Sequence, residues 1–317
     1  MTIVTRRREL LTAGLAIGVA GLAPVLMPRA AIGQSAASGT IRHSQGETKL
    51  PKAVNKVLCF DMASLDTLDA LGVPVAGAPT QAKPAYLAKY DGPGYARIGT
   101  LFEPDYEVVN AAQPDLIIVG GRSAPKYAEL SAIAPTIDLT VKPERFFDSA
   151  LENAGILGRI FDKGTEVKAR ADKLRSTVAE VKAIAAGAGK GMLILTTGGK
   201  ISAYGPGSRF GVLHTEYGVV PAAEKIDTSN HGQAVNFEFI LQTNPDWLFV
   251  LDRDSAIGRE GQSAKQLLDN EIVRRTTAWR KGQVVYLNAA NWYLIGGGLQ
   301  AMQQDADHIK TSLTGKA

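Results

Sequence analysis

The chain contains two copies of one segment, and this repetition constrains the fold more than any other feature of the sequence. Residues 105–122, DYEVVNAAQPDLIIVGGR, align without a gap on residues 236–253, NFEFILQTNPDWLFVLDR. The identical pairs are Glu107/Glu238, Pro114/Pro245, Asp115/Asp246, Val119/Val250 and Arg122/Arg253. Each copy predicts a short helix, a stop at Pro-Asp, a buried strand and an arginine just past the strand. A duplicated lobe is the simplest explanation of this pattern.

Short apolar runs alternate with amphipathic stretches on both sides of a long helical pattern. The runs are 57–60, 73–76, 116–119, 136–139, 192–196, 247–251 and 284–287. This alternation is typical of parallel sheets covered by helices. The helical pattern runs from about residue 146 to 186 with a break at 162–164, and residues 167–184 carry an apolar stripe at helical spacing. We therefore expect an α/β protein with two βα lobes, 34–145 and 188–317, joined by a spine helix within 146–187.

The first 33 residues are typical of an export signal. Arg6, Arg7 and Arg8 precede an apolar stretch of Gly, Ala and Leu, which is the pattern of a twin-arginine signal peptide. Cleavage is expected after Gly33, with Ala37 as a second candidate site, and the product would be periplasmic. The alternative is a retained membrane anchor, but the stretch is short for a span and is interrupted by glycine and proline.

Composition excludes several partners. The chain of 317 residues is 45% hydrophobic and carries 35 Lys and Arg against 31 Asp and Glu, but four of those arginines and one glutamate lie in the first 33 residues. The remainder is nearly neutral and offers no bulk field for nucleic acid or for an anionic membrane. The lone Cys59 is expected to be a buried thiol. His43, His214 and His308 show no spacing typical of a zinc site.

Three arginines are candidates for one binding site. Ligands of open parallel sheets bind beyond the carboxyl ends of the strands, which would bring Arg122 and Arg253 to one cleft from opposite lobes. Arg209 lies in the glycine-rich turn YGPGSRFG and would join them. Three guanidinium groups together suit a ligand with several anionic oxygens. The alternative for each is an ordinary surface or ion-paired residue, most seriously for Arg253, which lies between Asp252 and Asp254.

Two further loop residues could bind a hard metal. His231 precedes the second repeat copy, and Tyr293 follows the last predicted strand next to Trp292. A phenolate oxygen and an imidazole nitrogen are both ligands for ferric iron. Taken alone, a histidine or tyrosine in a loop is more often just a surface residue.

The sequence resembles a known family over almost all of the chain after the signal. The motifs are FDMASLDTLDALGVPVAG at 60–77, YGPGSRFG at 204–211, NHGQAVNFEFI at 230–240, NPDWLFVLDR at 244–253 and NAANWYLIGGGLQ at 288–300. They are similar to the class III periplasmic substrate-binding proteins of iron-complex ABC importers, particularly the ferric-siderophore binders of the enterobactin and petrobactin type. The loop at 81–86 varies in that family, so the resemblance does not fix the siderophore.

The resemblance implies roles for individual residues. Arg122, Arg209 and Arg253 match the arginines that surround catecholate oxygens, with Trp292 in the same ligand-binding set. His231 and Tyr293 match residues that complete the iron's coordination when a siderophore supplies only four donor atoms. Glu107 and Glu238 match the glutamates that dock each lobe on the membrane permease dimer, which works with an ATPase. The resemblance also implies a monomer with a largely preformed cleft and no permanently bound cofactor.

Other functions remain open from the residues themselves. Haem could use His231 and Tyr293 as axial ligands, although its two propionates would leave one arginine unused. Cobalamin would need no arginine cluster. An exported enzyme acting on iron complexes would need a catalytic or cofactor motif. The turn at 205–209 is neither a phosphate-binding loop nor a dinucleotide-binding turn, and the sequence has no Gly-x-Ser-x-Gly elbow.

Overall fold

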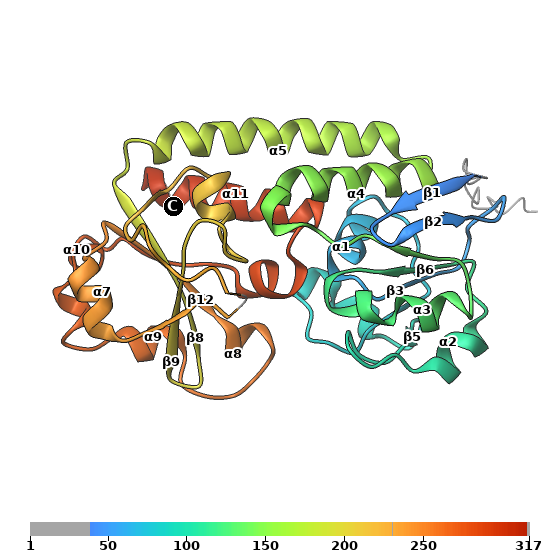
Figure 1. The fold of residues 1–317 in the computed structure, drawn as a ribbon, viewed down its shortest axis with the longest axis horizontal. Coiled ribbons are helices and arrows are strands. Elements are labelled where there is room, and N and C mark those ends of the chain that lie inside the picture. The colour runs from blue at the N-terminus through green and yellow to red at the C-terminus, as the bar shows by residue number, and fades with distance from the viewer. Residues whose placement is uncertain (1–38, 230, 316–317) are drawn as a thin grey trace, which may run out of the picture. The chain divides into compact units, whose positions relative to one another are not determined.

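The computed structural model describes residues 39–229 and 231–315, so the predicted signal peptide at 1–33 lies outside the described residues. The described residues belong to one compact unit with two large sheets and a small two-stranded one. Each sheet lies in one half of the ribbon in Figure 1, and helix α5 (Gly164–Ala185) extends along both halves. The α/β class with two lobes is therefore confirmed. The lobe boundaries at 145 and 188 stay predictions.

The N-terminal sheet is fully parallel, as expected, in the order β5-β4-β3-β6-β7. Its strands are β3 (Val57–Cys59), β4 (Gly77–Ala78), β5 (Ala96–Arg97), β6 (Leu116–Val119) and β7 (Thr136–Asp138). The helices around it are α1 (Met62–Ala70), α2 (Tyr106–Ala112) and α3 (Tyr127–Ser131), with 3₁₀ turns η1 (Ala85–Asp91), η2 (Gly121–Lys126) and η3 (Pro143–Arg145). Cys59 is buried in β3 as a free thiol.

The C-terminal sheet is mixed, which corrects the expectation of parallel strands alone. Its main order is β11-β9-β8-β12-β13, and β9 is antiparallel to both of its neighbours. The strands are β8 (Lys190–Thr197), β9 (Lys200–Tyr204), β10 (Val220–Pro221), β11 (Gln233–Val235), β12 (Trp247–Asp252) and β13 (Val284–Tyr286). The helices are α6 (Val212–Thr215), α7 (Phe237–Thr243), α8 (Arg253–Ala256), α9 (Ala264–Leu268) and α10 (Thr277–Arg280), with the 3₁₀ turn η4 (Val273–Arg275). Gly198 and Gly199 adopt positive φ between β8 and β9, which is the conformation a tight hairpin requires.

Helices form the connection between the two sheets. The predicted helical pattern is two helices, α4 (Phe146–Ile160) and α5, and the break between them contains Asp162 at a positive φ. The C-terminal helix α11 (Leu299–Thr314) packs against α5 and α1. Asp66 of α1 accepts hydrogen bonds from the backbone N–H groups of Gln300 (2.8 Å) and Ala301 (3.2 Å) at the start of α11. A Cβ at Gly298 would overlap this carboxylate, so the approach requires glycine.

The two copies of the sequence repeat, 105–122 and 236–253, have the same local structure. Helices α2 and α7 both begin at a side-chain cap, since Asp105 accepts from the N–H of Val108 and Asn236 from that of Phe239. Both helices end at a left-handed residue before the Pro-Asp pair. In both copies the aspartate accepts from the backbone at the start of the neighbouring strand, Asp115 from Lys56 and Asp246 from Lys190.

Two local predictions needed correction. The apolar run 73–76 is not a strand, although Val73 and Val75 are buried, because pairing begins only at Ala76 and the strand β4 follows at Gly77. The hairpin of β1 (Thr40–His43) and β2 (Gly46–Lys49) was not predicted, because its residues are mostly exposed and polar. None of the helices in the described part of the chain has the length and hydrophobicity needed to cross a bilayer.

Candidate functional site

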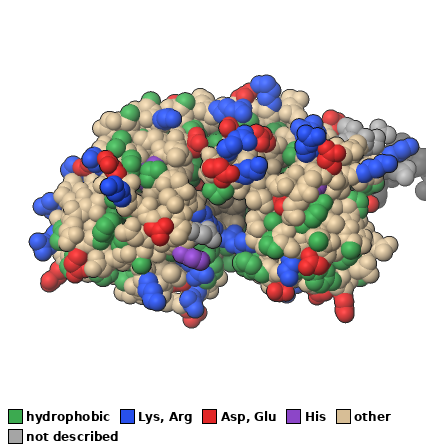
Figure 2. All heavy atoms as spheres, in the orientation of Figure 1, with side chains coloured by type: hydrophobic (Ala, Val, Ile, Leu, Met, Phe, Trp, Pro, Cys, Tyr) green, Lys and Arg blue, Asp and Glu red, His purple; other side chains and the backbone are tan. Residues whose placement is uncertain are grey.

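A cleft lies between the two lobes. Figure 2 shows this hollow between the halves of the molecule, with Lys and Arg side chains inside it. Its volume is about 170 Å³, and its lining comes from α1, η2 and α4 on one side and from the 209–217 segment on the other. The π-helical turn η5 (Ala290–Ile295) and α11 complete the lining. Arg122, Arg209, Trp292 and Tyr293 all line this cleft.

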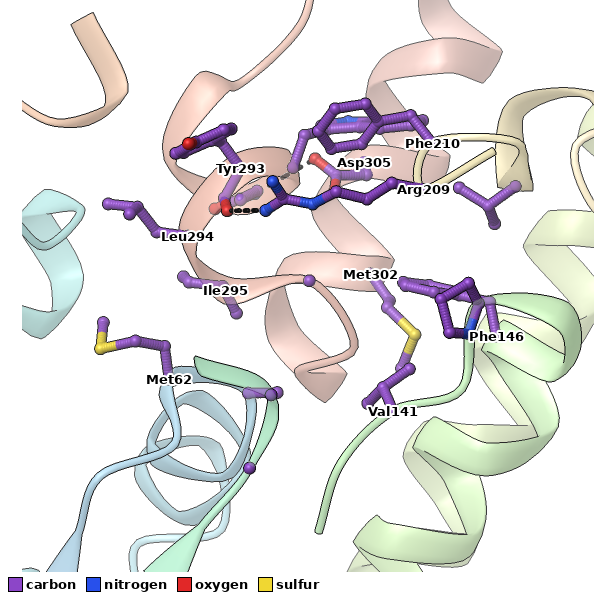
Figure 3. A pocket seen from close by; sticks show the side chains of 18 of the residues that line it. Met62, Val141, Phe146, Arg209, Phe210, Tyr293, Leu294, Ile295, Met302 and Asp305 are labelled. Carbon is purple, nitrogen blue, oxygen red and sulfur yellow. Dashed lines mark hydrogen bonds between the residues drawn. The ribbon is translucent and has the colours of Figure 1, made fainter. Parts of the chain in front are cut away.

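The three predicted arginines converge on Tyr293. Its backbone carbonyl accepts hydrogen bonds from Nη2 of Arg122 (2.6 Å) and Nη2 of Arg209 (2.7 Å). Its phenolic oxygen accepts from Nε of Arg253 at 2.7 Å. The three guanidinium carbons lie 4.6–5.4 Å from the centre of the Tyr293 ring, within cation–π range. Figure 3 shows Arg209 extended toward Tyr293, with its hydrogen bond to the Tyr293 carbonyl drawn as a dashed line. One residue therefore holds all three arginines from separate segments of the chain.

Arg122 is positioned by the end of the N-terminal sheet. Asp138 at the end of β7 accepts from the hydroxyl of Thr140 (2.6 Å), and Thr140 accepts from the N–H of Gly121 (2.9 Å). Gly121 has a φ of 51°, which starts the turn that carries Arg122 into the cleft. Burial lowers the pKa of Arg122, and the nearby charge of Arg209 lowers it further. The guanidinium remains charged. The free-energy cost of holding this charge buried and close to Arg209 would fall if an anion bound.

The aspartates that flank Arg253 are bonded mainly to other groups. Asp252 caps α8, since it accepts from the N–H of Ser255. Asp254 accepts from Thr197 and from the N–H of Gly198, and it lies 4.0 Å from Nη1 of Arg253. Although partial burial opposes ionisation of Asp254, these hydrogen bonds and nearby arginine charges leave its pKa below the usual value. The carboxylate thus has partners besides Arg253, and Arg253, which is not among the residues that line the cleft, donates to Tyr293 from behind.

The backbone of η5 presents Tyr293 to the arginines. The turn is π-helical, a rare geometry that is frequent at functional sites. It ends at Gly296 with φ 58° and ψ −150°, a conformation open essentially only to glycine. Burial alone would raise the pKa of the Tyr293 phenol. The hydrogen bond from Arg253 and the charges of the three guanidinium groups outweigh burial, so the pKa lies below its ordinary value. The lowered pKa means that this phenol ionises more readily than a free tyrosine, and an ionised phenol is the stronger hydrogen-bond acceptor.

The structure does not bring His231 to Tyr293. His231 is exposed in the turn before β11 and is not among the residues that line the cleft. Its neighbour Gly232 packs against the ring of Tyr204, whose edge contacts Phe210 beside Arg209. The turn therefore lies close to the site's outer edge, on the C-terminal lobe. No group of three or more His, Cys, Asp or Glu side chains in the described residues could hold a metal ion.

Most of the lining residues were not predicted from the sequence, and the polar ones among them include Asn291, Asp305 and Asp61. Asn291 is fully buried, and its amide donates to Gln304 (3.0 Å) and Asp305 (3.2 Å). Burial raises the pKa of Asp305 well above its usual value, and burial likewise raises the pKa of Asp61. The indole N–H of Trp292 is near enough to Asp305 to oppose that shift but lacks hydrogen-bond geometry. Met302, on α11, also lines the cleft. In the sequence, only the spacing of residues 302 and 305 on one face of the last helix could have pointed to Met302 and Asp305.

Glu107 and Glu238 occupy equivalent places on the two lobes. Each is the second residue of its helix, α2 or α7, and each is exposed. The two helices lie at opposite ends of the ribbon, and α5 extends along the edge away from them (Figure 1). The sequence pairing of these glutamates is therefore matched by their placement in the fold.

Comparison with known proteins agrees with this architecture. Residues 57–290 match the family described as periplasmic binding protein. The chain is 45% identical over 279 residues to the petrobactin-binding protein YclQ of Bacillus subtilis, covering 86% of this chain and 88% of the relative. It is 32% identical to the ferric-anguibactin-binding protein FatB of Vibrio anguillarum, covering 85% of each chain. The solved structure of the catecholate-siderophore binding protein VctP of Vibrio cholerae has 30% identity and a TM-score of 0.82, covering 87% of this chain and all of that one.

The fold, the cleft and the comparisons together identify the class and the family of this protein. Two lobes that share a cleft lined by preplaced cations are the architecture of an extracytoplasmic solute-binding protein. The chain belongs to the periplasmic binding protein family, as the sequence resemblance implied. Its relatives are binding components of importers rather than enzymes, and the family places it outside the cytoplasm.

Proposed function

We propose that this protein captures a ferric catecholate-type siderophore in the cleft between its lobes. The observation that carries the proposal is the convergence of Arg122, Arg209 and Arg253 on neutral acceptors of one residue. A ferric tris-catecholate carries about three negative charges, which three arginines can offset without help from the chain's small net charge. The names of the petrobactin-binding and ferric-anguibactin-binding relatives support an iron–siderophore complex as the cargo.

Within that proposal, Tyr293 is the metal-facing oxygen donor for a siderophore that leaves coordination sites open. Its phenol pKa is lowered by the arginines around it, which favours the phenolate form that ferric iron binds. His231 would be the second donor. Because its side chain is exposed outside the cleft lining, the turn would have to move to bring its imidazole to the iron. Trp292 would contact the ligand from the same turn as Tyr293.

After capture, the protein would deliver the ferric siderophore to the membrane permease. The protein would act as a monomer in the periplasm, after export by the twin-arginine route and cleavage near Gly33. Lobes at 34–145 and 188–317, linked through 146–187, would dock on the two halves of a permease dimer through Glu107 and Glu238. The exposure of these glutamates at matching helix positions supports this arrangement. The energy for transport would come from the importer's ATPase, and the protein itself would catalyse no reaction.

A titration of the chain from Gln34 onward tests the proposal. Ferric tris-catecholate and a linear ferric bis-catecholate would be added separately while fluorescence and the visible spectrum are recorded. Trp292 lines the cleft, so both complexes should quench its emission. A shift of the iron charge-transfer band with the bis-catecholate alone would place protein atoms on the iron. Binding of haem with no binding of either catecholate would keep the transport role and reject this ligand class.

A further inference from the structure

The hairpin of β1 and β2 packs on the edge of the N-terminal sheet. It lies beside β7, the last strand of that sheet (Figure 1). The N–H of Ser44 donates to the carbonyl of Asp138 at 3.0 Å, and the hydroxyl of Thr48 donates to the carbonyl of Thr136 at 2.7 Å. Contacts of this kind cover a free strand edge, which is the ordinary role of a short hairpin in such a place. Edge protection therefore accounts for these two bonds.

The side chain of Gln45, in the turn of the hairpin, makes contacts that edge protection does not require. Its Nε2 donates to Oδ2 of Asp138 at 2.8 Å and to the carbonyl of Ala124 at 2.9 Å. Ala124 belongs to η2, the turn that also carries Arg122. Gln45 therefore joins the hairpin to the segment that presents an arginine to the cleft.

Asp138 continues this connection toward Arg122. Its side chain is buried, and its Oδ1 accepts from both the N–H (2.9 Å) and the hydroxyl (2.6 Å) of Thr140. The Oγ1 of Thr140 accepts in turn from the N–H of Gly121, the residue before Arg122, at 2.9 Å. A buried carboxylate oxygen that loses its donor carries a desolvation cost, so removing Gln45 would favour a rearrangement of Asp138. The bonds form one path from the hairpin to the backbone at Arg122.

The η2 turn also has a support that does not involve the hairpin. The hydroxyl of Ser123 accepts from the N–H of Gly120 at 3.0 Å and donates to the carbonyl of Phe60 at 3.2 Å. Ser123 is fully buried, so this support lies inside the lobe. The turn should therefore persist without Gln45, and the expected result is a less well ordered Arg122 rather than an unfolded lobe.

Arg122 depends on such support because its side chain is long. Its Nη2 and Nη1 donate to the carbonyls of Tyr293 (2.6 Å) and Leu294 (3.4 Å), far away in the sequence. Ordering a free arginine side chain costs conformational entropy each time an anion binds. When the backbone that carries the side chain is already fixed, less of this cost falls on the binding step.

We propose that the N-terminal hairpin positions Arg122 for ligand binding, and that Gln45 is the positioning residue, acting through Asp138, Thr140 and the η2 turn. Gln45 is not among the residues that line the cleft, so it would act without touching the ligand. This inference rests on the proposed function for the identity of the ligand only. The bonds between the hairpin and the η2 turn are the same whichever anion the arginines bind.

A double-mutant cycle tests whether Gln45 acts through Arg122. Gln45→Ala should weaken binding of a ferric tris-catecholate, followed by tryptophan fluorescence, about fivefold, the scale of one neutral hydrogen bond. Glu47→Ala breaks an exposed ion pair with Arg42 on the same hairpin and should bind as the wild type does. Gln45→Ala should have no further effect in Arg122→Ala, but its full effect in Arg209→Ala. No loss in the wild-type background, or an equal loss in both arginine variants, would overturn the proposal.

A measurement without ligand separates this inference from the proposed function. NMR relaxation gives an order parameter for the Nε–H bond of each arginine, and the Arg122 signal is identified by its absence in Arg122→Ala. In Gln45→Ala the order parameter of Arg122 should fall into the flexible range, below about 0.6, while that of Arg209 stays unchanged. A general loss of structure would lower both.

The two measurements can fail separately. If the wild type binds no ferric catecholate and only Arg122 loses order in Gln45→Ala, the siderophore assignment fails and the positioning role stands. If Arg122 keeps its order parameter, the positioning role is rejected whatever the affinities are. Should Gln45→Ala fail to fold, Thr140→Val breaks the same path at its bond to Gly121 and should give the same pattern.

Discussion

Arg253 donates a hydrogen bond of 2.7 Å to the phenolic oxygen of Tyr293, although two aspartates flank Arg253 in the sequence. The carboxylate of Asp254 instead accepts from Thr197 and Gly198. Apart from a long ion pair of 4.0 Å between Arg253 and Asp254, the three arginines are therefore held by neutral acceptors, chiefly the phenol and the carbonyl of Tyr293. An incoming anion can replace a neutral acceptor with gain, because hydrogen bonds to a charged acceptor are stronger.

Removing Arg253 should change the titration of Tyr293. The Arg253→Ala variant loses the hydrogen bond and one of three charges that lower the phenol's pKa, so this pKa should rise. Ultraviolet difference absorbance during an alkaline titration measures it, with Tyr293→Phe subtracted to remove the other tyrosines. Arg274→Ala, which breaks an exposed ion pair with Asp269, is the matched control and should leave the titration unchanged. Equal titrations in all variants would show that Arg253 does not act on this phenol.

Each of the three arginines that contact Tyr293 should contribute separately to ligand affinity. Arg122→Ala, Arg209→Ala and Arg253→Ala should each weaken a ferric tris-catecholate by at least ~1.5 kcal/mol, the scale of one charge-assisted hydrogen bond. Fluorescence titration gives the dissociation constants, again with Arg274→Ala as the control. Unchanged affinity in all three variants would remove the arginines from the binding site.

Tyr293→Phe should distinguish two kinds of ligand. The substitution removes the phenolic oxygen but keeps the backbone carbonyl that holds Arg122 and Arg209. Binding of a hexadentate tris-catecholate should therefore change little, while a tetradentate bis-catecholate should lose affinity and show a shifted iron charge-transfer band. Identical visible spectra for wild type and variant with the bis-catecholate would exclude Tyr293 from the metal's coordination.

The stability of the protein should depend on pH through Asp66. Burial raises the pKa of this carboxyl from 3.8 to about 6 in the folded protein, against the opposing effect of its hydrogen bonds from Tyr86 and the start of α11. Between these values the unfolded chain has released the proton and the folded chain retains it, so the free energy of unfolding falls as pH rises. Between pH 4 and pH 7 the loss from this group is about 2 kcal/mol. Urea unfolding at pH 4 and pH 7 should show a drop that is smaller by this amount in Asp66→Asn, and equal drops would contradict the prediction.

The docking role of the glutamates can be separated from ligand binding. Glu107→Ala with Glu238→Ala should leave the dissociation constant for the ferric siderophore unchanged, because both residues lie outside the cleft lining. Uptake of radioactive iron by cells that depend on this protein should fall. Glu129→Ala, an exposed glutamate on α3, is the control and should transport normally. Normal uptake by the double variant would place the permease contact elsewhere.

The sequence predicted the repeat, three of the parallel N-terminal strands and the convergence of the three arginines, because these depend on local pattern and on the rule that strand ends meet at one edge. Other features depend on contacts that no local pattern encodes. The antiparallel strand β9 is polar at its first position and follows a glycine pair, so it lacks the apolar run by which strands were found. The backbone carbonyl of Tyr293 has no side-chain signature. Asp305 reaches the cleft because α11 packs on α1 and α5, and Asn291 of η5 donates a hydrogen bond to it there.

The packing of α11 against α1 limits when the N-terminal lobe can complete its folding. Asp66 is synthesised early, but the N–H groups that it accepts from belong to Gln300 and Ala301, near the end of the chain. The first helix of the N-terminal lobe therefore cannot complete its contacts while the ribosome is still adding the second lobe. These bonds can form only once the last helix has been synthesised. A twin-arginine signal, as proposed for residues 1–33, suits such a chain, because that route waits for a folded cargo before moving it across the membrane.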